Sequence, residues 1–561
     1  MIRTVAALLL AAATATALPG QDPGQRRALD RLRDSLALSR DTAAILSLER
    51  ELIEVARIER DDPMHHLRLG LIAMRLAELR PTRPHLDHAA GEFTWAAELR
   101  PDWPWPWYGI GLAESRGQDR AGGFAGGLWT MVGQDRDRLS AEAFARAVSV
   151  DPTFVRGLLE FAHVALEQRI DAPLGPALHA LRIATATPLG WDSRLLLERG
   201  RLERRSGFTD SAIVALRRAV QLAIHPAEAR LELARTLALA GPIAGDAGDS
   251  VRNAVMHQYL EASTSTDPEL VGAIRRQLEP IAYPWELVAF DSLDAAHRAE
   301  WLQNFWLRRD AIDLREPGGR LAEHFRRWEV ATRDFRLPPF RRRYRLWTET
   351  YRSGDREFDD RGIVYVRHGE PTVRIEWPRG RTQVRVDPLQ HNYGNESWRY
   401  DRADGTLTLH FVARDDPSDF KLVDSPRELD VALDQLERHA HEIPGLDRMI
   451  RAGAASAVWV ESDVRRSVRN SIDIATNTDS WQRTYAEILD GRAQWLAAGV
   501  RSGHPLVHIV YTVDAEALRQ AAPDGAGTVP VRVRASFFDT AGTPVARLDT
   551  VQHVAVPRPG V

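Results

Sequence analysis

The sequence predicts a multidomain protein: an all-α solenoid of helical repeats, then an α+β domain, then a β-rich, sandwich-like C-terminal segment. Three observations predict this order. Helical apolar spacing recurs from about residue 45 to 242, two aromatic-rich helical patterns precede short strand patterns between 285 and 430, and alternating β-branched residues dominate after Pro505. A chain of 561 residues is also too long for a single core, because domains typically have about 100 to 200 residues. The predicted segments are 1–20 (signal peptide), 21–284 (repeats), 285–430 (α+β domain), 431–504 (mixed or helical connector) and 505–561 (β-rich segment).

The composition excludes several classes of function. The net charge is −4, so no broad electrostatic attraction to nucleic acid or acidic membranes is expected. The chain contains no cysteine, which excludes disulfides, thiolate zinc sites and a cysteine nucleophile.

The N-terminus has the three parts of a secretory signal peptide. Arg3 precedes an apolar run from Val5 to Ala13, and small residues at Ala13, Ala15 and Ala17 fit a cleavage site. The run is shorter than the about 20 residues that span a bilayer, and no later apolar stretch is long enough. We therefore expect export to the periplasm, the cell surface or the medium, and a mature chain without a transmembrane span. The sequence leaves open whether the exported chain associates with the envelope.

The repeats are marked by prolines that follow helical apolar patterns. Their spacings are 38, 51, 36 and 38 residues, and the longest interval holds the glycine-rich insertion 122–127; the prolines are Pro63, Pro101, Pro152, Pro188 and Pro226. With its small-large-small helix pattern, the segment resembles the tetratricopeptide repeat, whose period is about 34 residues, in degenerate units that carry insertions. The resemblance implies stacked helix pairs that bury their apolar faces only against neighbouring pairs.

An aromatic cluster runs from Trp103 to Tyr108. It has two interpretations: a stacking platform for sugars or peptides, or a wedge between successive helices. We favour the wedge, because large aromatic side chains are commonly core residues.

Local signals place the elements of the predicted α+β domain. Ser292 is expected to cap a helix that carries an aromatic stripe around Trp301 to Trp306, and a second helix is expected from about 320 to 335. A strand is predicted at 362–366, and a hairpin over 396–412 turns at Asp404-Gly405. The sequence Ser425-Pro426-Arg427-Glu428 forms a capping box that predicts a helix to about 441.

The order and spacing of several motifs in residues 285–430 resemble the bacterial GWxTD domain. The stretch 300–310 resembles its opening helix, 359–365 its name motif, 369–371 its turn after the strand, and 396–400 a later strand. The family's Gly-Trp and Thr are replaced here by 356–359, so only Asp360 of the name motif is retained. The residues that carry the resemblance, all expected to be structural, are Trp301, Phe305, Trp306, Arg309, Asp310, Asp360, Arg361, Gly362, Gly369, Pro371, Trp398 and Tyr400. The resemblance implies an exported bacterial protein and no catalytic residues.

A catalytic alternative centres on the motif Arg367-His368-Gly369-Glu370. In histidine phosphatases, a histidine in such a motif is the nucleophile and arginines hold the phosphoryl group. No later histidine is followed by glycine, and a four-residue match in a long chain has a high false-positive risk. Metal ligation by the pairs His85 and His88, or His439 and His441, lacks a third ligand, so we predict neither metal nor cofactor.

The sequence therefore predicts an exported, non-enzymatic protein that binds a protein or peptide through the surface of its helical repeats. Phosphoryl hydrolysis by His368 and Arg367 is the alternative. Only 57 residues follow His504, so the final strands belong to a truncated domain or complete a sheet begun earlier.

Overall fold

The computed structural model describes residues 23–556, apart from 81–82, 118–125, 168–172, 338–350, 356, 378–393, 403–404, 415, 430, 432, 444, 452–456, 480–490, 502, 523–526 and 541–543. The predicted signal peptide, positions 122–125 of the glycine-rich insertion and Asp404 of the predicted turn lie outside the described residues.

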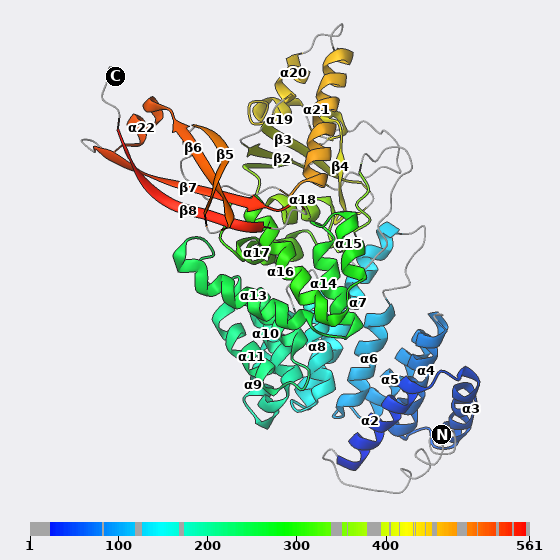
Figure 1. The fold of residues 1–561 in the computed structure, drawn as a ribbon. Coiled ribbons are helices and arrows are strands. Elements are labelled where there is room, and N and C mark those ends of the chain that lie inside the picture. The colour runs from blue at the N-terminus through cyan, green and yellow to red at the C-terminus, as the bar shows by residue number, and fades with distance from the viewer. Residues whose placement is uncertain are drawn as a thin grey trace.

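The N-terminal part is an array of helical repeats (Figure 1), which confirms the predicted all-α repeat organisation. Helices adjacent in sequence pack against each other as the pairs α4 with α5, α6 with α7, α10 with α11 and α12 with α13. The elements are α2 (Pro23–Leu38), α3 (Thr42–Ile58), α4 (Pro63–Leu79), α5 (Arg83–Leu99), α6 (Pro104–Gly117), α7 (Gly126–Val150), α8 (Val155–Glu167), α9 (Leu174–Thr185), η2 (Pro188–Trp191), α10 (Ser193–Arg205), α11 (Thr209–Leu222), α12 (Ala227–Leu237), η3 (Asp246–Gly248), α13 (Asp249–Ser263) and α14 (Pro268–Leu278).

The predicted prolines lie at or near helix boundaries, and two of the five open the next helical element. Pro63 is the first residue of α4, where Asp62 accepts the N–H of Met64, and Pro188 opens η2 behind Thr187. Proline suits the first helical position because its missing N–H has no partner there and its φ is already helical.

Phe93 shows how neighbouring repeats fit together. Its side chain is fully buried between α4 and α6, where Gly70 and Gly109 leave room for the ring. A Cβ on either glycine would lie 2.4 Å from the ring of Phe93. Trp105 and Tyr108 are buried in the same core, so the wedge interpretation of the aromatic cluster holds for these side chains.

The α+β part is a four-stranded antiparallel sheet with a helical layer on each face. One face, with Trp398, Tyr400 and Leu409, packs in a core shared with helices α12 to α18 and α21; the other, with Trp377 and Val412, packs against residues from 429 to 446. The strand order is β1-β2-β3-β4, and Trp398 pairs with Leu409. The elements are α15 (Pro284–Asp291), α16 (Ala295–Ile312), α17 (Gly319–Asp334), α18 (Asp360–His368), β1 (Val373–Trp377), β2 (Gly394–Arg402), β3 (Gly405–Ala413), β4 (Phe420–Val423), η4 (Pro426–Glu428), α19 (Leu433–Arg438), α20 (Leu446–Arg451) and α21 (Ala457–Asn477).

Residues 360–368 form helix α18, so the strand predicted at 362–366 was wrong. Asp359 caps the helix by accepting the N–H of Gly362, and Gly369 ends it at a φ of +76°. Residues 362–366 form a continuous apolar run because the helix is buried on nearly every side. Periodicity cannot distinguish such a run in a buried helix from a buried strand.

Two predicted helix starts are also corrected. Asp294, not Ser292, caps α16, and Ser292 follows the end of α15. Ser425 accepts the N–H of Arg427, but only the single turn η4 follows, and α19 covers 433–438 instead of a helix reaching 441.

Two β-hairpins with a short helix between them follow α21. They are β5 (Gly491–Arg501) with β6 (His504–Val513), and β7 (Thr528–Phe538) with β8 (Pro544–Ala555), separated by α22 (Ala515–Ala521). The β-rich end is confirmed, but strands begin at 491, inside the predicted connector, and each sheet has two strands, so no packed sandwich is present among the described strands. Figure 1 shows the hairpins extending as long ribbons beside α17 and α18. No helix of the described part is both long and apolar enough to cross a membrane.

Candidate functional site

The structure gathers most of the motif residues of the α+β part into one buried core. Trp301 packs against Phe305 with ring centroids 5.2 Å apart, and Phe305 packs edge-on against Trp306. Trp398 contacts Tyr400 on the same face of β2, and the Tyr400 hydroxyl donates to the Gly369 carbonyl at 2.9 Å.

The charged motif residues on α16 hold the helices around them. Both terminal nitrogens of Arg309 donate to the Glu286 carboxylate, at 3.1 and 2.9 Å. Asp310 accepts the backbone N–H groups of Gly318 and Arg320, each at 2.7 Å, and so caps α17. Burial raises the pKa of Asp310 to about 7.

Asp360 and Arg361, at the start of α18, tie this helix to the sheet. Asp360 accepts the N–H of Leu422 in β4 at 2.8 Å. Arg361 donates to Asp359 and Glu396, and its guanidinium lies 3.4 Å from the centroid of the Phe420 ring. Asp360 and Arg361 thus join α18 to strands β2 and β4.

The residues of the catalytic alternative lie at the end of α18. His368 is only 1% exposed, its Nε2 is 2.7 Å from the carbonyl oxygen of Ala475, and burial lowers its pKa to about 3. Arg367 is half-buried and donates from Nη1 to the Thr478 carbonyl at 3.2 Å. Gly369 lies against Arg327 and Glu370 is exposed. His368 thus has a backbone partner at the atom that would attack or transfer a proton.

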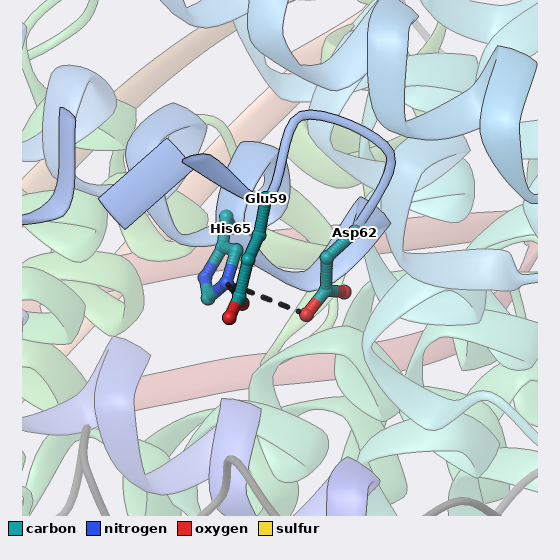
Figure 2. Close-up of side chains that lie close together, drawn as sticks. All are labelled: Glu59, Asp62 and His65. Atoms are coloured by element: carbon teal, nitrogen blue, oxygen red, sulfur yellow. Dashed lines mark hydrogen bonds and ion pairs between the residues drawn. The ribbon is translucent and has the colours of Figure 1, made fainter. Parts of the chain in front are cut away.

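A possible metal-binding group lies at the turn between α3 and α4, where sequence analysis had not placed one. Figure 2 shows Glu59, Asp62 and His65 side by side, with Nε2 of His65 2.7 Å from Glu59 and 3.5 Å from Asp62. One nitrogen and two carboxylate oxygens suit a divalent cation such as zinc. Asp62 also caps α4, however, and Nδ1 of the buried His65 has no hydrogen-bond partner among the described residues, whereas a ligating histidine usually donates from its second nitrogen.

The predicted histidine pairs have nearby carboxylates instead of a metal ligand set. His88 lies 3.4 Å from Glu92, which raises the pKa of His88 by accepting a hydrogen bond. His439 lies 2.8 Å from Glu442.

The most exposed aromatic side chains of the repeats lie beside arginines on α9 to α11. Trp191 is 69% exposed, and the guanidinium of Arg218 lies 5.0 Å from its ring centroid. Phe208 is 49% exposed, and Arg182 lies 4.7 Å from its ring. Arg218 and the exposed Val214 lie one turn apart on α11 and so on the same face of the helix. The pair of Phe208 and Arg182 lies near the start of α11, and the pair of Trp191 and Arg218 lies near its end. We call these side chains, Arg182, Trp191, Phe208, Val214 and Arg218, the α11 surface.

Comparison with known proteins adds little to this geometry. No family model matches the chain, and no curated protein matches it. A solved structure with similarity is that of YrrB, described as a TPR protein with an unusual peptide-binding site; it is 13% identical, and the match covers 39% of this chain and 94% of YrrB. The TM-score is 0.28, too low to support an argument from the YrrB site.

Proposed function

We propose that the protein is a non-enzymatic interaction protein that binds a protein or peptide segment on its helical repeats, at the α11 surface. The observation that carries this proposal is the pairing of exposed Trp191 and Phe208 with arginines, beside the exposed Val214 on α11. Tryptophan, other aromatic residues and arginine are enriched where proteins bind one another.

The charge of the neighbouring helices indicates an acidic partner. Residues 174–237 contain 10 arginines and 6 acidic residues, a net charge of +4 (10 − 6), although the whole chain carries −4. A local positive field speeds the encounter with an oppositely charged segment and selects against basic ones. The proposed ligand is therefore an acidic segment with at least one apolar side chain.

A displayed library of random peptides, selected on the full-length protein, tests this proposal. We expect enrichment of acidic peptides, weaker binding at higher salt, and at least tenfold weaker binding by the double variant Trp191→Ala, Phe208→Ala. Trp459→Ala is a matched control because Trp459 is also largely exposed but lies on α21. Failure to enrich any peptide family, or equal binding by the double variant, would contradict the proposal.

Export and the GWxTD-like character of residues 285–430 belong to the same proposal. Export is supported by the apolar run that follows Arg3, and the GWxTD-like domain by the order of its motifs. Mass spectrometry of the protein produced in a bacterial host would detect removal of about the first 20 residues. An intact N-terminus in the envelope fraction, or retention in the cytoplasm, would count against export.

A further inference from the structure

Three arginines from successive helices meet at the residues that follow α21. Arg320 of α17 donates to both oxygens of Asp479, at 2.7 and 3.2 Å. Nε of Arg309 in α16 lies 3.9 Å from the same carboxylate, and Arg367 of α18 donates to the adjacent Thr478 carbonyl. Five arginines from α16, α17, α18 and the loop between α16 and α17 form what we call the arginine cluster: Arg309, Arg315, Arg320, Arg327 and Arg367.

Ion pairs account for four of the five arginines in the cluster. Four carboxylates form ion pairs with four of the five arginines: Glu286 with Arg309, Asp313 and Glu323 with Arg315, Glu323 with Arg327, and Asp479 with Arg320. Among the described residues, no carboxylate lies within ion-pair distance of Arg367. Asp310 instead accepts two backbone N–H groups, so the cluster has one cation more than it has paired anions.

Several buried donors in this region have no hydrogen-bond acceptor among the described residues. They are Nη1 of Arg320, Nε of Arg309, Nε of Arg367 and the one protonated ring nitrogen of His324, whose ring is neutral because burial lowers its pKa well below the usual value. Arg320 and His324 are 0% exposed and stand one turn apart on α17. Each unpaired buried donor costs about 1–3 kcal/mol, and native proteins contain few. A group that accepts several hydrogen bonds would remove this cost.

The crowding of positive charge also appears in the titration of the cluster. Burial, followed by the charges of Arg320 and Arg327, lowers the pKa of Arg315 to about 10. An added anion would relieve this mutual repulsion.

We propose that the arginine cluster, with Arg320 and Arg367 as its principal donors, is a binding site for a phosphate group. A phosphate offers several acceptor oxygens in different directions and close to two negative charges near pH 7, and arginine pairs with it through parallel N–H groups. The site has access to solvent, because Arg367 is half-buried and the side chains of Asp479 and Glu323 are each 17% exposed. Because Nε2 of His368 already faces Ala475, the proposal is binding and includes no phosphoryl transfer.

Thermal unfolding of the full-length protein tests the site. We expect inorganic phosphate and methyl phosphate to raise Tm above its value in chloride at equal ionic strength, and acetate to leave it unchanged, because a ligand that binds only the folded state stabilises it. A larger rise with methyl phosphate would identify a monoester as the preferred form, and a larger rise with inorganic phosphate would identify the free ion. Equal rises with acetate and phosphate, or no rise with phosphate, would overturn the proposal.

Variants localise the effect. Arg367→Gln removes the arginine that has no carboxylate, so we expect at least a threefold smaller phosphate-dependent rise in Tm, measured against the Tm of the same variant in chloride. Arg333→Gln, on the exposed face of α17, is the control and should keep the full rise. We also expect the wild type to broaden the phosphorus-31 resonance of inorganic phosphate. This measurement does not depend on the folding of any variant. A full rise in Arg367→Gln, or an unbroadened resonance, would contradict the assignment.

Discussion

The imidazole Nε2 of His368 lies 2.7 Å from the carbonyl oxygen of Ala475, and this contact joins the end of α18 to α21. The carbonyl can only accept, so Nε2 carries the proton and donates it. Four residues that look catalytic in the sequence therefore include a histidine that holds two helices together.

The first prediction concerns pH. Burial lowers the pKa of His368 to about 3 in the folded protein, whereas histidine in an unfolded chain titrates near its ordinary value of 6.5. The unfolded state thus binds the proton more readily, and the contribution of His368 to stability is complete above pH 6.5 and declines as the pH falls towards 3. The slope is at most about 1.4 kcal/mol per pH unit.

Chemical denaturation between pH 7 and pH 4 measures this effect. His368→Gln cannot titrate, so we expect its free energy of unfolding to fall less steeply than that of the wild type. His297→Gln, at an exposed position on α16, should follow the wild-type curve. Parallel curves for the wild type and His368→Gln would show that the side chain does not titrate as predicted.

The second prediction concerns the catalytic alternative. Because His368 is 1% exposed and donates to Ala475, a phosphomonoester would have to displace α21 before it could reach Nε2. We expect wild type and His368→Ala to hydrolyse p-nitrophenyl phosphate at the same background rate. A wild-type rate well above background that the variant loses would favour phosphoryl hydrolysis instead.

The third prediction tests the close approach of α4, α5 and α6. Gly109→Ala would place a Cβ 2.4 Å from the buried ring of Phe93, and overpacking of this kind costs about 1–3 kcal/mol. Gly91→Ala on α5 is the matched control, since no atom lies within 4 Å of its added Cβ. Alanine in a helix is better than glycine by about 0.5–1 kcal/mol, so the control should be neutral or stabilising. Equal Tm shifts of the same sign for both variants would refute the packing argument.

The fourth prediction concerns Asp360. Asp360→Ala leaves the buried N–H of Leu422 without this acceptor, and we expect a loss of about 1–3 kcal/mol in the free energy of unfolding. Asp360→Asn keeps an acceptor oxygen and should lose less. Equal losses for the two variants would mean that the hydrogen bond to β4 is not what stabilises this position.

Much of the fold follows from local patterns in the sequence. The helix predicted at 320–335 is α17, and the hairpin predicted over 396–412 is β2 with β3, because apolar residues recur at helical spacing in the first segment and at alternate positions in the second. Residues 360–368 show neither spacing clearly, because nearly all of them are buried. The sequence therefore predicted a strand where the structure has a helix.

The candidate sites depended on contacts that no local pattern reveals. Arg320 and Asp479 are 159 positions apart, so nothing near either residue indicates the pair. The exposure of the aromatic residues was equally hard to predict: Trp105 follows Pro104 and Trp191 follows Pro188 by three positions, yet Trp105 is buried and Trp191 is exposed. The spacing of Glu59, Asp62 and His65 is the signal in the sequence for this group, because two acidic residues and a histidine fall close together at one turn.

The core that contains Trp398 also contains Val255 and Tyr259 of α13, and this sets where the chain can be divided. A fragment that ends at residue 284 keeps α13 but loses α16 and α17, which cover α13. Such a fragment would expose an apolar surface that favours aggregation. The first core runs from Leu29 to Leu202 and closes before that point. A fragment made for binding or crystallisation should therefore keep α12 to α21 together, and should also keep α10 and α11, whose apolar side chains pack with α12.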